Sequence, residues 1–218
     1  MTIMKNAVIW ILSILACCPV MAANLAAPWV GESLSGAACQ GPSAGNFGPY
    51  DYLVHKDKLP VVENRHFTSR VEQLQAGETS KNPMGDIRYT LVKFPNHHRA
   101  LYSAVRFNLA NRNEASRRRY PAECFLQRAI HFSPKDPVPY MLYGLYLHRL
   151  GKLEQSLEKY QTAERLAPND ANLLYNIGLV HFDRKNYSES HRYAVKAYSH
   201  GIGLPGLKRK LQQAGHWK

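Results

Sequence analysis

The chain has 218 residues, enough for one domain with a substantial hydrophobic core. No run of about 20 apolar residues follows the first 22 residues, so no further membrane span is expected. Lysine and arginine number 28 against 16 aspartate and glutamate, and the net charge of +12 favours acidic partners or anionic surfaces. The basic residues are scattered and no recognition motif surrounds them, so nucleic acid is not an expected partner.

Residues 1–22 have the features of a bacterial secretory signal peptide. A lone Lys5 precedes the apolar run 7–16, and residues 20–22 form a cleavage site of small residues. Cleavage there makes Ala23 the first residue of a mature chain with 27 basic and 16 acidic residues, a net charge of +11. We therefore expect a periplasmic protein.

A second processing route is open at Cys17. The tetrapeptide Ile14-Leu15-Ala16-Cys17 looks like a lipobox, which precedes acylation of the cysteine in bacterial lipoproteins, although Leu15 is unusual at its position. Lipidation of Cys17 would tether the protein to a membrane, which is the alternative location.

Residues 23–95 are predicted to form an extended, mostly irregular N-terminal arm with one short helix. Glycine and proline are frequent in the first part of this arm, but Phe47, Tyr50 and Tyr52 lie close together in the sequence. Three aromatic side chains in so short a stretch indicate that the arm docks on the folded part of the protein.

Two weaker patterns follow in the arm. The spacing Ser69-x-x-Glu72 is that of a capping box and predicts the short helix within residues 61–80. Beyond it, apolar and polar residues alternate through 87–93, which predicts a short extended stretch. No partner strand is evident, so no sheet is predicted.

From residue 96 onward the apolar spacing predicts pairs of helices. Asn96 is placed to cap the first helix, and Pro121 is a favoured residue for the start of the second. Leu207 and Leu211 mark the apolar side of a C-terminal capping helix. The three helical units and the capping segment occupy approximately residues 96–136, 137–170, 171–204 and 205–218.

Residue sizes recur at steps of 34 along these units. The recurring small positions are Ala110, Gly144 and Gly178 in the first helices, and Ala122, Ser156, Ser190, then Ala129, Ala163, Ala197 in the second helices. The central unit also contains Tyr140-x2-Tyr143-Gly144-x2-Leu147 and Pro168. This pattern resembles the tetratricopeptide repeat (TPR), and the resemblance implies an all-α solenoid of about three helix-turn-helix repeats.

The resemblance also implies a place for a partner. In the TPR family the first helix of each repeat lines a concave groove that binds protein segments. The corresponding positions of this chain are Phe107, Asn111, Met141, Leu145, His148, Asn172, Tyr175, Leu179 and Phe182. A competing interpretation is that the aromatic residues of the arm cover part of this groove, because an exposed apolar surface of that size favours aggregation.

The sequence contains no recognisable catalytic, nucleotide or cofactor motif, so we predict no catalytic residue and no cofactor. Of the ten histidines, His66, His97 and His98 form the most suggestive group for a metal. Adjacent histidines on a helix point about 100° apart and seldom share an ion, so no metal site is predicted.

After signal removal two cysteines remain, Cys39 and Cys124, an even number in an oxidising compartment. They either form a disulfide that ties the arm to the first repeat or remain as two thiols.

The resemblance to the TPR family, together with the predicted export, implies a non-enzymatic scaffold or adaptor of the bacterial cell envelope, which binds protein segments and helps to assemble or recruit envelope components. The alternative function is binding of an anionic envelope polymer, such as peptidoglycan or lipopolysaccharide, through the basic surface.

Overall fold

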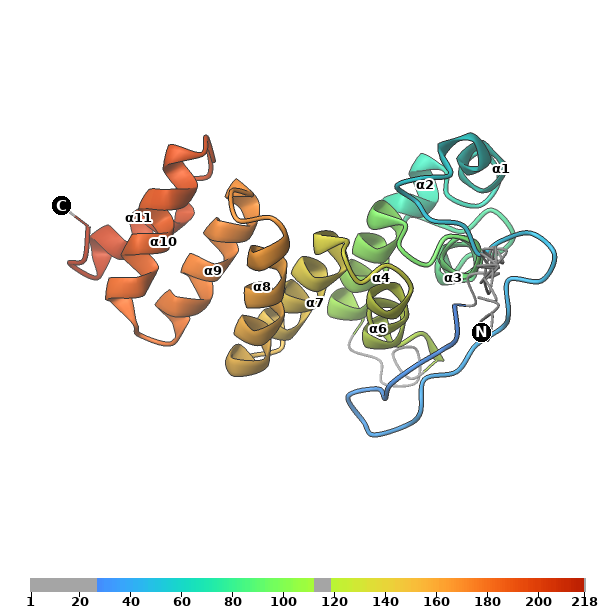
Figure 1. Cartoon of the computed structure of the whole chain (residues 1–218), viewed down its shortest axis with the longest axis horizontal. Helices are drawn as coiled ribbons and strands as arrows, with labels where there is room; N and C mark the ends of the chain where they lie inside the picture. Colours follow the sequence, from blue (N-terminus) through green and yellow to red (C-terminus); the bar gives the residue numbers. More distant parts are fainter. Residues whose placement is uncertain (1–26, 112–118, 218) are drawn as a thin grey trace, which may run out of the picture.

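A computed structural model describes residues 27–111 and 119–217, and the regular elements of these ranges are all helices. In Figure 1 the helices follow one another in a row along the long axis, and the arm lies at the N-terminal end near α3 and α6. The predicted all-α solenoid is therefore confirmed. The elements are η1 (Lys56–Lys58), α1 (Leu59–Glu63), α2 (Ser69–Glu72), α3 (Met84–Lys93), α4 (His98–Ala110), α6 (Ala122–Phe132), α7 (Pro137–Arg149), α8 (Leu153–Leu166), α9 (Ala171–Asp183), α10 (Tyr187–Ser199) and α11 (Gly206–Gln213).

The predicted signal peptide, residues 1–22, and the lipidation candidate Cys17 lie outside the described residues. Within the ranges that are described, no helix has the length and apolar character needed to cross a membrane.

The second and third repeats share the same contact between their two helices. Ser156 Oγ of α8 donates a hydrogen bond to the carbonyl of Gly144 in α7, and Ser190 Oγ of α10 donates to Gly178 in α9, both over 2.8 Å. A Cβ added to Gly144 would lie 2.6 Å from ring atoms of Tyr160. The glycine and serine recur every 34 residues because the two helices approach too closely for larger side chains.

The first unit departs from this register. Its N-cap, His97, stands 39 residues before Asp136, whereas Asp136 and Asp170 cap α7 and α9 only 34 residues apart. Ala110 is consequently the exposed last residue of α4, and its predicted place at a helix crossing is wrong. The second helix keeps the register, because Ala122 and Ala129 of α6 are fully buried.

The prediction that Asn96 caps α4 is also wrong. His97 caps the helix, because its Nδ1 accepts a hydrogen bond from the backbone N–H of Ala100 at 3.2 Å. The amide of Asn96 instead donates to Asp51 and Asp136, so that it joins the arm to the start of α7.

The segment before α4 is more helical than predicted. Residues 87–93 belong to α3 and are not extended, because Met84, Ile87 and Leu91 form one buried stripe at helical spacing. The helix at Ser69 exists but spans four residues, and its N-cap, Thr68, makes no side-chain capping bond. The predicted capping box is thus absent, and the single expected helix is replaced by α1, α2 and α3.

The arm docks on the folded part, but away from the first helices of the second and third repeats. Phe47, Tyr50 and Tyr52 pack against a small apolar cluster from the later part of the arm, Leu59, Val62 and Phe94, and the ring of Tyr52 also packs against His97 and His98 at the start of α4. These aromatic residues therefore do not cover the predicted groove.

A disulfide joins Cys39 to Cys124, with a Cα–Cα distance of 5.3 Å. This disulfide ties the arm to α6. Of the two interpretations open from the sequence, a disulfide or two thiols, the first is therefore confirmed.

The C-terminal helix closes the solenoid as predicted. Leu207 and Leu211 of α11 are fully buried, and a Cβ added to Gly178 would lie 2.6 Å from Leu207. The hydroxyl of Tyr175 in α9 accepts a hydrogen bond from the backbone of Leu207 at 3.0 Å. Capping of this kind protects the apolar end that a solenoid would otherwise expose.

Candidate functional site: a groove along the first helices

A hollow of about 760 Å³ runs along the first helices of the three repeats. We call it the groove. α4 contributes most of its wall, α7 and α9 continue it, and the turn after α2 closes one side. Its lining residues are Leu74, Tyr102, Val105, Arg106, Leu109, Ala110, Leu145, Arg149 and Asn176.

The groove combines apolar surface with positive charge. Tyr102 is 44% exposed, and the guanidinium of Arg106 lies 5.6 Å from the centre of its ring. Arg106 also donates to the carbonyl of Glu72 at 3.1 Å, which fixes the direction of its side chain. Among the described lining residues the other charged one is Arg149, which is exposed, and none is an aspartate or a glutamate. The groove therefore suits a ligand with both apolar and anionic groups.

One wall of the groove holds an unusual backbone conformation. Leu74 has a φ of 61°, in the left-handed region that favours glycine. Such conformations cost about 1–3 kcal/mol and persist where the surrounding structure enforces them. The side chain of Leu74 packs against the N-terminal core cluster and lines the groove.

Of the nine residues predicted to line a partner groove, only Leu145 belongs to this lining. Phe107 is buried in the N-terminal core cluster, and Asn111 is the C-cap of α4. Asn172 is exposed on the first turn of α9. Three others pack against the C-terminal core cluster and are partly buried: Met141, Leu179 and Phe182.

The remaining two predicted groove residues hold the solenoid together. Tyr175 is buried and binds the start of α11 through its hydroxyl, as described above. His148 Nε2 lies 2.7 Å from the carboxylate of Asp183, and Lys210 approaches the same carboxylate at 3.7 Å. These contacts link α7, α9 and α11.

The groove residues of α4 that were not predicted follow from its shifted register, whereas Leu74, Arg149 and Asn176 lie on other segments. Leu145 stands nine positions after the N-cap of α7, and the ninth position after His97 is Arg106. Counting from the capping residue of each helix, rather than by steps of 34, would have identified Arg106. The residue that would have revealed Arg106 is the N-cap of α4, which the sequence predicted at Asn96 and which is His97.

The three histidines considered for a metal site pair with carboxylates instead. The contacts are His66–Asp86 at 2.8 Å, His97–Glu63 at 3.0 Å and His98–Asp136 at 2.7 Å. In the described parts of the chain no group of three or more His, Cys, Asp or Glu could hold a metal ion.

His97 shows why these pairs are structural contacts. Its Nδ1 accepts a hydrogen bond from Ala100, so the proton is on Nε2, which donates to Glu63. Burial lowers the pKa of His97, and the hydrogen bond from His97 lowers the pKa of the Glu63 carboxyl. A neutral imidazole thus joins α1 to the start of α4.

Comparison with known families agrees with the geometry. Residues 144–184 match the family model described as TPR repeat, and this match covers the C-terminal part of α7 and all of α8 and α9. No curated protein matches the chain. TPR repeats generally mediate protein–protein interaction, and their groove side chains determine the ligand. Residues 144–184 are thus similar to the TPR repeat family, and the repeated serine–glycine contacts and the helical row agree with that similarity.

Proposed function

We propose that the groove binds an extended, acidic segment of a partner protein, and that the protein acts as a non-enzymatic adaptor in the bacterial cell envelope. The observation that supports this proposal is the pairing of Arg106 and Arg149 with an apolar lining in which none of the described residues is acidic. Arginine binds carboxylates through two parallel hydrogen bonds, which makes it suited to recognise acidic side chains or a free carboxyl terminus.

The other lining residues complement this role. Tyr102, Leu109 and Leu145 offer apolar contact area, and aromatic and aliphatic anchors supply much of the affinity in such interfaces. Asn176 carries a side-chain amide that can both donate to and accept from the backbone of an extended peptide. The groove can thus hold a segment along its length and select it by charge.

Charge reversal in the groove tests the proposal. Arg106→Glu with Arg149→Glu should weaken binding of acidic peptides at least tenfold, about 1.4 kcal/mol, because attraction becomes repulsion. Binding would be measured on an array of peptides in which Asp or Glu alternates with apolar residues, beside a matched array with Asn or Gln. A wild-type protein that binds both arrays equally would contradict the proposal.

A matched control carries the same change in charge elsewhere. Arg165→Glu with Arg209→Glu alters two exposed residues of α8 and α11, outside the groove lining. This control should bind acidic peptides as the wild type does. Equal losses in the two double variants would show that net charge, and not the groove, determines binding.

Binding of an anionic envelope polymer is the second candidate function. It is favoured by Lys208 and Arg209, which are consecutive and exposed on α11, and by the net charge. The same assay separates the two functions when salt is added. Polymer binding through exposed charges should collapse as ionic strength rises, whereas groove binding with apolar anchors should lose only part of its affinity.

The envelope location is part of the proposal and is supported by two observations. Residues 1–22 have the pattern of a secretory signal, and the Cys39–Cys124 disulfide suits an oxidising compartment. Intact mass of the protein isolated from its native cells should correspond to a chain that begins at Ala23. A chain that begins at Cys17 with additional lipid mass would indicate the tethered form, and an unprocessed chain would contradict export.

A further inference from the structure

Arg128 of α6 is only 2% exposed, although its side chain is charged. Its Nε donates to the carbonyl of Ala27 at 2.8 Å, Nη1 donates to Leu91 at 2.6 Å, and Nη2 approaches the carbonyl of Val92 at 3.4 Å. These carbonyls occupy three of the five guanidinium hydrogens, and none of them carries a full negative charge. Burial lowers the pKa of Arg128 to about 10, so the group remains cationic at neutral pH.

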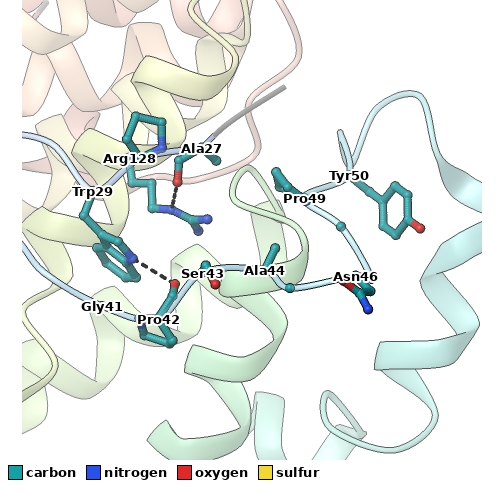
Figure 2. Close-up of a pocket in the computed structure, with 13 residues that line it drawn as sticks. Ala27, Trp29, Gly41, Pro42, Ser43, Ala44, Asn46, Pro49, Tyr50 and Arg128 are labelled. Atoms are coloured by element: carbon teal, nitrogen blue, oxygen red, sulfur yellow. Dashed lines mark hydrogen bonds between the residues drawn. The ribbon is translucent and has the colours of Figure 1, made fainter. Parts of the chain in front are cut away.

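The guanidinium reaches into a hollow of about 780 Å³ between the arm and the helices, as Figure 2 shows. The indole of Trp29 lies beside it, with 4.9 Å between the guanidinium carbon and the ring centre. Pro42, Pro49 and Tyr50 supply further apolar wall. A volume of this size is typical of sites for small molecules.

The charged residues that line this hollow and a neighbouring one are basic. A smaller hollow of about 260 Å³ shares Pro42 and Ser43 with it and is lined by Arg88 and Lys93. Neither lining contains an aspartate or a glutamate. An anion in either hollow would therefore meet positively charged lining side chains and no negatively charged ones.

The walls of the hollow are held in place without a ligand. Trp29 Nε1 donates to the carbonyl of Pro42 at 3.1 Å, and a Cβ added to Gly41 would lie 2.3 Å from the indole ring. Lys93 Nζ donates to the carbonyl of Ala44 at 2.5 Å. Residues 41–50 of the arm are thus fixed over the hollow, so that binding requires little further ordering.

We propose that this hollow binds a small organic anion whose carboxylate or phosphate group contacts Arg128 and whose apolar body lies against Trp29 and the prolines. The site shares no lining residue with the groove, so this ligand is additional to the protein segment proposed above. The unused guanidinium hydrogens and the basic surroundings select the charged end, and the indole selects an apolar or aromatic body.

Calorimetric titration of the full chain with three probes tests the site. Benzoate should bind with one-to-one stoichiometry, and benzamide, which has the same shape and no charge, should bind at least tenfold more weakly. Phenyl phosphate distinguishes the two anionic groups, because the tighter of the two anions identifies the natural one. Equal binding of benzoate and benzamide, or no binding of either anion, would overturn the proposal.

Variants locate the binding. Arg128→Lys keeps the positive charge but loses the planar fork, so benzoate affinity should fall at least tenfold. Because Arg128 also holds the arm and α3, a second variant leaves it intact. Ser43→Phe fills the hollow from an exposed position of the arm and should abolish benzoate binding.

Two controls complete this test. Gln40→Phe adds the same ring at an exposed residue of the arm that does not line the hollow, and should bind benzoate normally. Arg106→Glu with Arg149→Glu should also leave benzoate binding unchanged, which separates this site from the groove. Equal affinity in Ser43→Phe and Gln40→Phe would show that the ligand binds elsewhere.

Discussion

Gly144→Ala should destabilise the protein by about 1–3 kcal/mol, although alanine is the better helix former. The added Cβ would lie 2.6 Å from Cδ1 and Cε1 of Tyr160, whose side chain is fully buried. The ring has no solvent to move into, so the helices α7 and α8 must separate slightly. Urea unfolding followed by circular dichroism would measure the loss.

Two other glycines provide controls for this prediction. At Gly178 the same Cβ would meet a terminal methyl of Leu207, a flexible group, so Gly178→Ala should cost less. At Gly85 in α3 nothing lies within 4 Å, and Gly85→Ala should be neutral or stabilise by about 0.5–1 kcal/mol. A stable Gly144→Ala variant would contradict the close contact of α7 with Tyr160.

Removal of the disulfide is expected to have an effect of similar size. Cys39→Ala with Cys124→Ala should lower the free energy of unfolding by roughly 2–4 kcal/mol, because the bond restricts a long loop in the unfolded chain. The two cysteines are 85 residues apart in sequence. The wild-type protein in reductant should show the same loss in urea unfolding, and the variant should not respond to reductant.

The arm should respond more strongly than the repeats. Without the disulfide, residues 27–45 remain attached to α6 by hydrogen bonds such as Leu34 N to Glu123 and Gln127 to the carbonyl of Glu32. Limited proteolysis should therefore cut this segment first while α7 to α11 stay intact. An unchanged denaturation midpoint and unchanged proteolysis would show that these hydrogen bonds alone hold the arm.

The second and third repeats could be predicted from the sequence because their contacts are periodic. Gly144 and Gly178 must be small, and Ser156 and Ser190 bond to them, so the requirement reappears in the sequence at a fixed interval. Leu207 and Leu211 could also be predicted, because their spacing of four residues places both on the buried side of α11. Contacts between residues at a fixed spacing can therefore be recognised in the sequence.

The secondary structure of the N-terminal part was not predicted correctly, because it depends on contacts between residues far apart in the sequence. Tyr89, Thr90 and Val92 have the composition of a strand, but burial of Ile87 and Leu91 in the core next to α4 favours a helix. Ala110 matches the repeat at a step of 34 by chance, because the longer connection to α6 shifts α4 along the sequence. The groove residues on α4 were missed for this reason.

Asp136 has a consequence for how the protein unfolds. Its carboxylate caps α7 through the N–H of Val138, and it also accepts from Asn96 and lies 2.7 Å from His98. In an ideal solenoid each repeat contacts only its neighbours, so the terminal units can fray one at a time. Here the first turn of α7 cannot open without releasing the start of α4 and the segment of the arm bound to Asn96. We therefore expect the start of α4, the first turn of α7 and the part of the arm bound to Asn96 to open together rather than one at a time.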